Sequence, residues 1–152
     1  MAQDLDGLRQ FAKRCDAEVK RKRADQRAIH ERLGARMQVE VRGQIRNKVN
    51  DDESHIRGIQ ARVVGSGGGY AAVRPSGTDS GPDSLNAITN YLENGHAIRR
   101  PGGRSPRYRP RIKVLYVSGR GFYNAARPSL PRMLQSEVDR WGREVAGRLG
   151  GR

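Results

Sequence analysis

One long helical pattern near the N-terminus constrains the fold of this chain more than any other feature. Apolar residues recur at every fourth position between residues 29 and 49, namely Ile29, Leu33, Met37, Val41, Ile45 and Val49. A similar stripe lies upstream and consists of Leu8, Phe11, Cys15 and Val19. Spacings of three and four residues place side chains on one face of an α-helix. The sequence therefore predicts a helix from residue 4 to about residue 49.

A basic segment interrupts the apolar stripe at residues 20–27. Five of its eight residues are Lys or Arg, one is acidic, and its only apolar residue is alanine. We expect either a solvated bridge or a break between two helices. Gly34 and Gly43 each cost roughly 1 kcal/mol relative to alanine inside a helix, so both indicate close packing.

Strand and turn signals replace the helical period after residue 54. Residues 55–64 place Ile59, Ala61 and Val63 on one face, which is typical of a half-buried strand. The glycine-rich turn at 65–69 then leads to a return strand at 70–74 and a polar loop at 75–84. The β-branched and aromatic residues of 112–117 predict a further strand.

Two more helices complete the expected order of elements. Residues 85–93 have apolar side chains at helical spacing, and Gly95 follows as a plausible cap of that helix. The last helix, residues 129–149, places five apolar residues on one side: Leu134, Val138, Trp141, Val145 and Leu149. The sequence thus predicts an α+β fold with a small, mostly antiparallel sheet, in a single domain spanning residues 1–152.

The supply of core-forming side chains is small for a chain of this length. Leu, Ile, Val and Phe account for 29 of 152 residues, and the net charge is +14. This ratio lies at the edge of the compositions typical of disordered chains. Because the helical and strand patterns argue against disorder, we expect a core that neighbouring subunits complete.

The excess positive charge is concentrated in the last third of the chain. Residues 99–152 contain 14 basic and 3 acidic residues, and half of these bases form a basic arm: Arg99, Arg100, Arg104, Arg107, Arg109, Arg111 and Lys113. Prolines at 101, 106 and 110 disfavour a helix or central strand there, so we expect an extended loop at residues 97–111. Three interpretations remain open, namely a solvated tip, contact with DNA phosphates, and docking on an acidic protein surface.

The sequence offers no convincing catalytic or metal-binding constellation. The segment GSGGG lacks the Gly-Lys-Ser/Thr ending of a phosphate-binding loop. His30, His55 and His96 lie in three different elements without metal-ligand spacing. The acids of the last helix, Glu137, Asp139 and Glu144, are expected on its solvated face. We therefore expect no enzyme activity, no cofactor and no metal site.

The cellular environment is constrained by cysteine usage and hydropathy. The single Cys15 excludes an internal disulfide and fits a small buried apolar role in a reducing cytoplasm. No run of 18 apolar residues exists, so we expect no membrane span.

Three segments in this order resemble the tail-component family of tailed bacteriophages. They are the long N-terminal helix, residues 90–100, and residues 117–135 running into the last helix. Family members often show an aromatic residue, an acid, Gly-His or Gly-Thr, a variable loop, and a step ending in Phe before the last helix. The matching positions here are Tyr91, Glu93, Gly95, His96, Gly121 and Phe122. The step reads Gly-Arg-Gly-Phe and lacks the proline that many relatives have, which leaves its turn geometry open.

The resemblance implies a structural virion protein that forms a ring, commonly of six copies, at the head-proximal end of the tail. Its role would be tail completion or head–tail joining, or alternatively that of a tail terminator capping the tail tube. Implied partners are further copies of the chain, head-closure or connector proteins, tail-tube or terminator proteins, and DNA in the channel. Assembly in the host cytoplasm would precede its place in the virion. On this interpretation residues 93–96 form a structural corner from which the basic arm begins, and His96 acts there as a hydrogen-bond donor.

A hypothesis of a different class is a stand-alone nucleic-acid-binding module without sequence preference. It would use residues 20–27 together with the basic arm. The sequence contains no helix-turn-helix spacing, zinc finger or aromatic-rich RNA-binding sheet, which argues against reading of base sequence.

Overall fold

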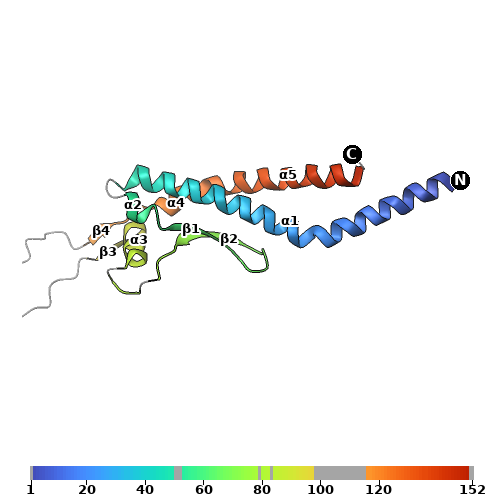
Figure 1. The fold of residues 1–152 in the computed structure, drawn as a ribbon. Coiled ribbons are helices and arrows are strands. Elements are labelled where there is room, and N and C mark those ends of the chain that lie inside the picture. The colour runs from blue at the N-terminus through green and yellow to red at the C-terminus, as the bar shows by residue number, and fades with distance from the viewer. Residues whose placement is uncertain (1, 50–52, 79, 83, 98–115, 151–152) are drawn as a thin grey trace, which may run out of the picture. The chain divides into compact units, whose positions relative to one another are not determined.

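The computed structural model describes residues 2–49, 53–78, 80–82, 84–97 and 116–150 (Figure 1). Its helices are α1 (Ala2–Lys48), α2 (Glu53–Ile56), α3 (Leu85–Asn94), α4 (Phe122–Ala126), the 3-10 turn η1 (Arg127–Ser129) and α5 (Leu130–Gly150). Its strands are β1 (Gln60–Val64), β2 (Ala71–Pro75), β3 (Gly95–Ala97) and β4 (Tyr116–Ser118). The α+β fold with long helices at both ends is confirmed.

α1 is one continuous helix through the basic segment, so the alternative of a break at residues 20–27 is wrong. Lys, Arg, Gln and Ala are all good helix formers, and none of them needs an apolar partner there. Residues 20–24 are exposed, as a solvated bridge requires. The close packing inferred at Gly34 is confirmed, because a Cβ there would lie 3.5 Å from the Ala71 Cβ. The same inference is wrong for Gly43, which has open space around it.

The strands form two separate two-stranded sheets, β1–β2 and β3–β4. In the second sheet the strands run antiparallel, with Gly95 opposite Ser118 and Ala97 opposite Tyr116. The strand predicted at 55–64 begins only at residue 60, because α2 and a turn occupy residues 53–59. The Gln60 side chain stabilises that turn by donating to the Ile56 carbonyl at 2.9 Å. Of the strand predicted at 112–117, residues 112–115 lie outside the described residues, and β4 covers 116–118.

The chain divides into two compact units. The helix-pair unit comprises residues 1–40, 62–73 and 128–152, and the corner unit comprises residues 41–61 and 74–127. In the helix-pair unit α5 packs along α1, and the glycine-rich turn between β1 and β2 contacts α1. The corner unit contains the end of α1 and all residues from α3 to α4 that the structure describes. The single domain predicted for residues 1–152 stays a prediction.

The two units differ in how they are held together. Every buried hydrophobic side chain among the described residues belongs to the corner unit: Val41, Ile45, Ile56, Phe122 and Ala126. In the helix-pair unit the buried side chain is the carboxylate of Glu137. The apolar residues of that unit are half-buried or exposed, so polar contacts must supply much of its stability.

The glycine-rich turn of residues 65–69 is the hairpin turn that the sequence predicts. Gly68 has a φ of 70°, and a Cβ on it would lie 2.8 Å from the Arg27 Cβ. His30 of α1 also contacts this turn, because its Nδ1 lies 2.6 Å from the Gly68 carbonyl oxygen. Glycine is therefore required here both by backbone conformation and by close approach to α1.

Candidate functional site

The structure places all six predicted corner residues in the corner unit, where the end of α3 meets the start of α4. α3 ends at Gly95, whose φ is 79°, and its backbone N–H donates to the Tyr91 carbonyl as a C-cap. A Cβ on Gly95 would overlap the Val117 carbonyl oxygen, so only glycine fits where β3 and β4 meet. Gly121, also left-handed with a φ of 61°, then starts α4.

Glu93 organises this corner from its centre. Its carboxylate is buried and accepts hydrogen bonds from the backbone N–H groups of Tyr123, at 2.9 Å, and Asn124, at 3.1 Å. Its backbone carbonyl accepts from Gly121 N at 3.1 Å. The first N–H groups of a helix carry partial positive charge and lack intrahelical partners. Glu93 therefore caps α4 from a distant part of the chain and fixes the step into the last helix.

A small polar network lies beside the Phe122 ring, which is completely buried. The Tyr123 hydroxyl donates a short hydrogen bond to the side-chain oxygen of Gln60. Gln60 is itself buried and donates to Ile56. Burial, together with the nearby Glu93 carboxylate, raises the pKa of Tyr123 to about 12. The phenol is thus a neutral structural donor at physiological pH.

Tyr91 and His96 form the outer side of the corner. Their ring centroids are 5.1 Å apart with a tilt of 41°, and His96 is exposed. Next to them the Tyr116 hydroxyl donates to the Asn94 carbonyl at 2.8 Å and so ties β4 to the end of α3. A hydrogen-bond donor role for His96 stays a prediction, whereas its ring contact with Tyr91 is a feature that sequence reasoning missed.

The corner fixes both ends of the segment that contains the predicted basic arm. Ala97 and Tyr116 are opposite each other in the β3–β4 register. The seven bases of that arm, Arg99, Arg100, Arg104, Arg107, Arg109, Arg111 and Lys113, lie outside the described residues. The chain therefore leaves and re-enters the described fold at one paired position.

A second polar centre lies in the helix-pair unit, around Glu137 of α5. Its carboxylate accepts from Arg32 Nε at 2.7 Å and from Arg36 Nη1 at 3.1 Å, and its side chain is 3% exposed. Burial opposes ionisation, but the hydrogen bonds from the two arginines and the charge of Arg140 hold the pKa of Glu137 below its ordinary value. The predicted solvated face is wrong for Glu137, because α1 covers it, while Asp139 and Glu144 are exposed as expected.

The far end of the same helix pair carries a second ion cluster. Arg148 donates to both oxygens of Glu18, at 2.7 and 2.8 Å, and to Asp25 at 2.7 Å. The indole N–H of Trp141 also donates to Asp25, at 3.0 Å. Sequence reasoning missed these contacts, since the partners are more than 100 residues apart and neither segment alone signals the other.

Beyond these contacts the helix-pair unit exposes large apolar side chains. Along the first half of α1 the apolar stripe Leu5, Leu8, Phe11 and Val19 is 45–73% exposed. The predicted helical stripe is therefore real as a pattern, but its upstream part faces solvent. Cys15, in the same stripe, is a free, half-buried thiol.

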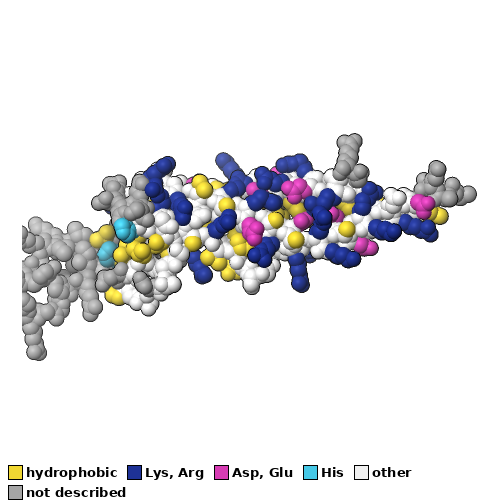
Figure 2. Space-filling model, in the orientation of Figure 1, with side chains coloured by type: hydrophobic (Ala, Val, Ile, Leu, Met, Phe, Trp, Pro, Cys, Tyr) yellow, Lys and Arg dark blue, Asp and Glu magenta, His cyan; other side chains and the backbone are white. Residues whose placement is uncertain are grey.

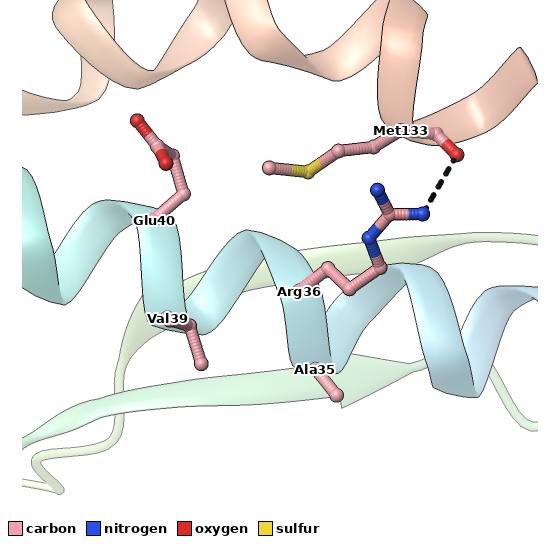
Figure 3. A pocket seen from close by; sticks show the side chains of 5 residues that line it. All are labelled: Ala35, Arg36, Val39, Glu40 and Met133. Atoms are coloured by element: carbon pink, nitrogen blue, oxygen red, sulfur yellow. Dashed lines mark hydrogen bonds between the residues drawn. The ribbon is translucent and has the colours of Figure 1, made fainter. Parts of the chain in front are cut away.

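An open, mostly apolar groove of about 380 Å³ lies between α1 and α5 (Figure 3). Its lining residues are Ala35, Arg36, Val39, Glu40 and Met133. Arg36 and Glu40 reach toward α5, and Arg36 donates to the Met133 carbonyl at 3.3 Å. The side chain of Val39 points away from α5 and is 73% exposed. A shallow surface of this kind fits a protein contact better than a small-molecule site, which is normally enclosed.

Within the described ranges no cluster of three or more His, Cys, Asp or Glu side chains could hold a metal ion. Among those same residues no helix is long and apolar enough to cross a membrane. Comparison of the chain with protein families, with curated proteins and with solved structures finds no match.

Proposed function

We propose that this chain is a structural subunit of a tailed-phage particle, a ring-forming head–tail joining or tail-completion protein. The observation that carries the proposal is the contrast between the two units. The corner unit has its own buried apolar core, whereas the helix-pair unit has an exposed apolar stripe, half-buried apolar side chains and the buried carboxylate of Glu137. Such a unit gains stability when further copies cover its apolar surface.

The size of the available gain can be worked from the exposures. Leu5, Leu8, Phe11 and Val19 expose about 60% of their surface on average, from 56%, 66%, 45% and 73%. Full burial of one such side chain contributes about 1.5–3 kcal/mol. Covering the four would thus contribute about 5 kcal/mol per subunit before the entropic cost of association. This value is comparable to the stability of a whole small domain. Association can therefore supply the stability that the few buried apolar side chains of the chain do not.

The corner supports the same proposal from a different direction. It contains the six motif positions of the resemblance to phage tail components, and its geometry is tightly specified around Glu93 and Gly95. It closes the segment of the predicted basic arm at the Ala97–Tyr116 pair. In a ring, a basic segment anchored at a rigid point could reach an acidic surface of the adjacent ring, and charge would speed the docking of the two.

The direct experiment measures the mass of the purified protein by sedimentation, alone and mixed with its neighbouring tail and head-closure proteins. The proposal predicts a ring in at least one mixture, and a ring that binds only the tail-tube protein would indicate a tail terminator. A Leu8→Gln/Phe11→Gln variant should form assemblies of lower mass than the wild-type protein. Tyr70→Gln is the control, since Tyr70 is 55% exposed but lies outside the stripe, and it should leave the assembly mass unchanged. A chain that stays monomeric with every component would refute the ring.

A further inference from the structure

Four consecutive bases of α1, Lys20, Arg21, Lys22 and Arg23, form a collar of exposed positive charge. All four are exposed, and their side chains form no ion pair or hydrogen bond within the described part of the chain. Figure 2 shows Lys and Arg side chains spread along the visible face of the helices, with fewer acids among them. The basic collar is thus a dense charge that the protein itself does not neutralise.

Most acids near the collar are already committed to other arginines, and Asp16, four residues before Lys20, is the exposed acid of the described residues nearby that forms no ion pair. Glu18 and Asp25 lie on either side of the collar in sequence, and both bind Arg148. Further along α1, Glu31 binds Arg27 at 3.0 Å. On α5, Glu137 binds Arg32 and Arg36. An external polyanion is therefore the natural counter-charge for the collar.

The linear density of the collar matches that of a nucleic acid duplex. At a rise of about 1.5 Å per residue, its four charges occupy roughly 6 Å of helix axis. Double-stranded DNA carries one negative charge per about 1.7 Å of its axis. The duplex value counts both strands, and each strand alone carries one charge per about 3.4 Å, so the collar matches the charge density of the two strands together.

The angular distribution of the four bases favours a grooved partner over a flat one. Successive residues turn by about 100° around the helix axis. Taking Glu18 as the side that faces α5, Arg23 and Lys20 lie about 140° and 200° away, on the far side of α1. Arg21 and Lys22 lie within about 60° of the α5 side and flank the helix pair. A flat acidic surface could reach only the far pair, whereas the phosphates of the two strands of a duplex lie at different angles around the helix axis and can meet both pairs.

We infer that Lys20, Arg21, Lys22 and Arg23 bind the phosphate backbone of double-stranded DNA without reading its sequence. The collar is built only from described residues of α1 and does not involve the predicted basic arm. DNA passes through a head–tail channel, so the inference is compatible with the proposed function. It does not depend on ring formation, because the charges belong to each separate chain.

The test is a salt titration of binding between the full-length protein and a mixed-sequence duplex of 30 base pairs, followed by fluorescence anisotropy. Each phosphate contact contributes about −0.9 to the slope of log Kobs against log salt. Replacing all four bases of the collar by Gln should make the slope shallower by about 3 to 4. Between 50 and 200 mM salt, this corresponds to about 100-fold less loss of affinity.

A matched control removes the same charge elsewhere. It carries Gln at four exposed arginines outside the collar: Arg62, Arg74, Arg127 and Arg132. Its slope should change by less than about 1. Two half-variants, Arg21→Gln/Lys22→Gln and Lys20→Gln/Arg23→Gln, test whether both pairs of bases contact DNA. If they do, each half-variant should make the slope shallower by a similar amount. Circular dichroism confirms that every variant keeps its helix content.

Two results would overturn the inference. Equal slope changes in the collar variant and the control would show that only overall charge matters. Tighter binding to poly-glutamate than to DNA, lost in the collar variant, would make an acidic protein surface the partner instead. Sedimentation of the same variants separates a failure of this inference from a failure of the proposed ring. A variant that loses DNA binding but keeps the mass of the assembly leaves the proposed function intact.

Discussion

Substitution of Glu137 by Gln tests most sharply how the helix-pair unit is held together. The carboxylate is nearly inaccessible and accepts two hydrogen bonds from guanidinium groups of α1, at 2.7 and 3.1 Å. Each hydrogen bond between charged groups contributes about 1.5–3 kcal/mol to stability. Glutamine has nearly the same shape and keeps one oxygen acceptor, so the loss is mainly that of the charge and of one bond.

The exposure of the two arginines limits the expected effect. Their side chains are 32% exposed for Arg32 and 43% exposed for Arg36, so water can partly replace the carboxylate. Breaking a fully buried pair would cost about 3–5 kcal/mol. We expect about 2 kcal/mol for Glu137→Gln, which lies below that range for this reason.

The fluorescence of Trp141 reports on this unit specifically. It is the only tryptophan of the chain, and its indole N–H donates to Asp25 across the same helix pair. At a fixed protein concentration, Glu137→Gln should lower the urea midpoint by about 1 M, given a typical slope of about 2 kcal/mol per M. Glu144→Gln on the exposed side of α5 is the control, and it should shift stability by less than about 0.5 kcal/mol.

The pH dependence gives a second reading of the same interaction. The folded-state pKa of Glu137 is lowered, so its contribution to stability is present above the ordinary pKa of 4.5 and is lost as pH falls through the folded value. The Gln variant should lack that acidic loss. In an Arg32→Gln background, Glu137→Gln should also cost less than alone, because the two groups interact. A destabilisation below 0.5 kcal/mol in the wild-type background would refute this account of the unit.

Three further substitutions test the turn and the corner. Gly68→Ala should cost about 2–3 kcal/mol by Trp141 fluorescence, because a Cβ is strained at its φ of 70° and would press on Arg27; Gly67→Ala, with open space around it, should be nearly neutral. Glu93→Ala should cost about 2 kcal/mol in a far-UV urea titration, since two N–H groups of α4 lose their acceptor, and an unchanged midpoint would contradict the capping role. The raised pKa of Tyr123 means that the folded state keeps its proton to higher pH than the unfolded state. Stability should therefore fall by about 2 kcal/mol between pH 10 and 12, and Tyr123→Phe should lack this loss.

Local patterns in the sequence predicted the long elements well. The helical periods predicted α1, α3 and α5, and the glycine-rich segment predicted the hairpin turn. These elements are decided by residues close together in sequence. Short elements were harder to predict, because β1 begins later than predicted and α2, β3 and α4 were missed. Segments of three to five residues are too short for a period to show.

Long-range polar contacts account for most of what the sequence did not reveal. Glu137 borders the apolar side of α5, three residues after Leu134, but its charge predicted exposure, and only the approach of Arg32 and Arg36 from α1 makes it a buried ion-pair centre. Glu93 was placed at the corner by resemblance, but its role as the cap of α4 depends on Tyr123 and Asn124, some 30 residues later. Such pairings depend on the fold and leave no periodic signal.

The central claim is that further copies of the chain cover the exposed half of the α1 stripe and so complete the helix-pair unit. The decisive measurement is the urea midpoint of Trp141 fluorescence over a 100-fold range of protein concentration. Association into a ring of six predicts that stability rises by about 1 kcal/mol per subunit for each tenfold increase in concentration, and that Leu8→Gln/Phe11→Gln removes most of this rise. A midpoint that is high and independent of concentration in the wild-type protein would show a self-sufficient chain and contradict the account.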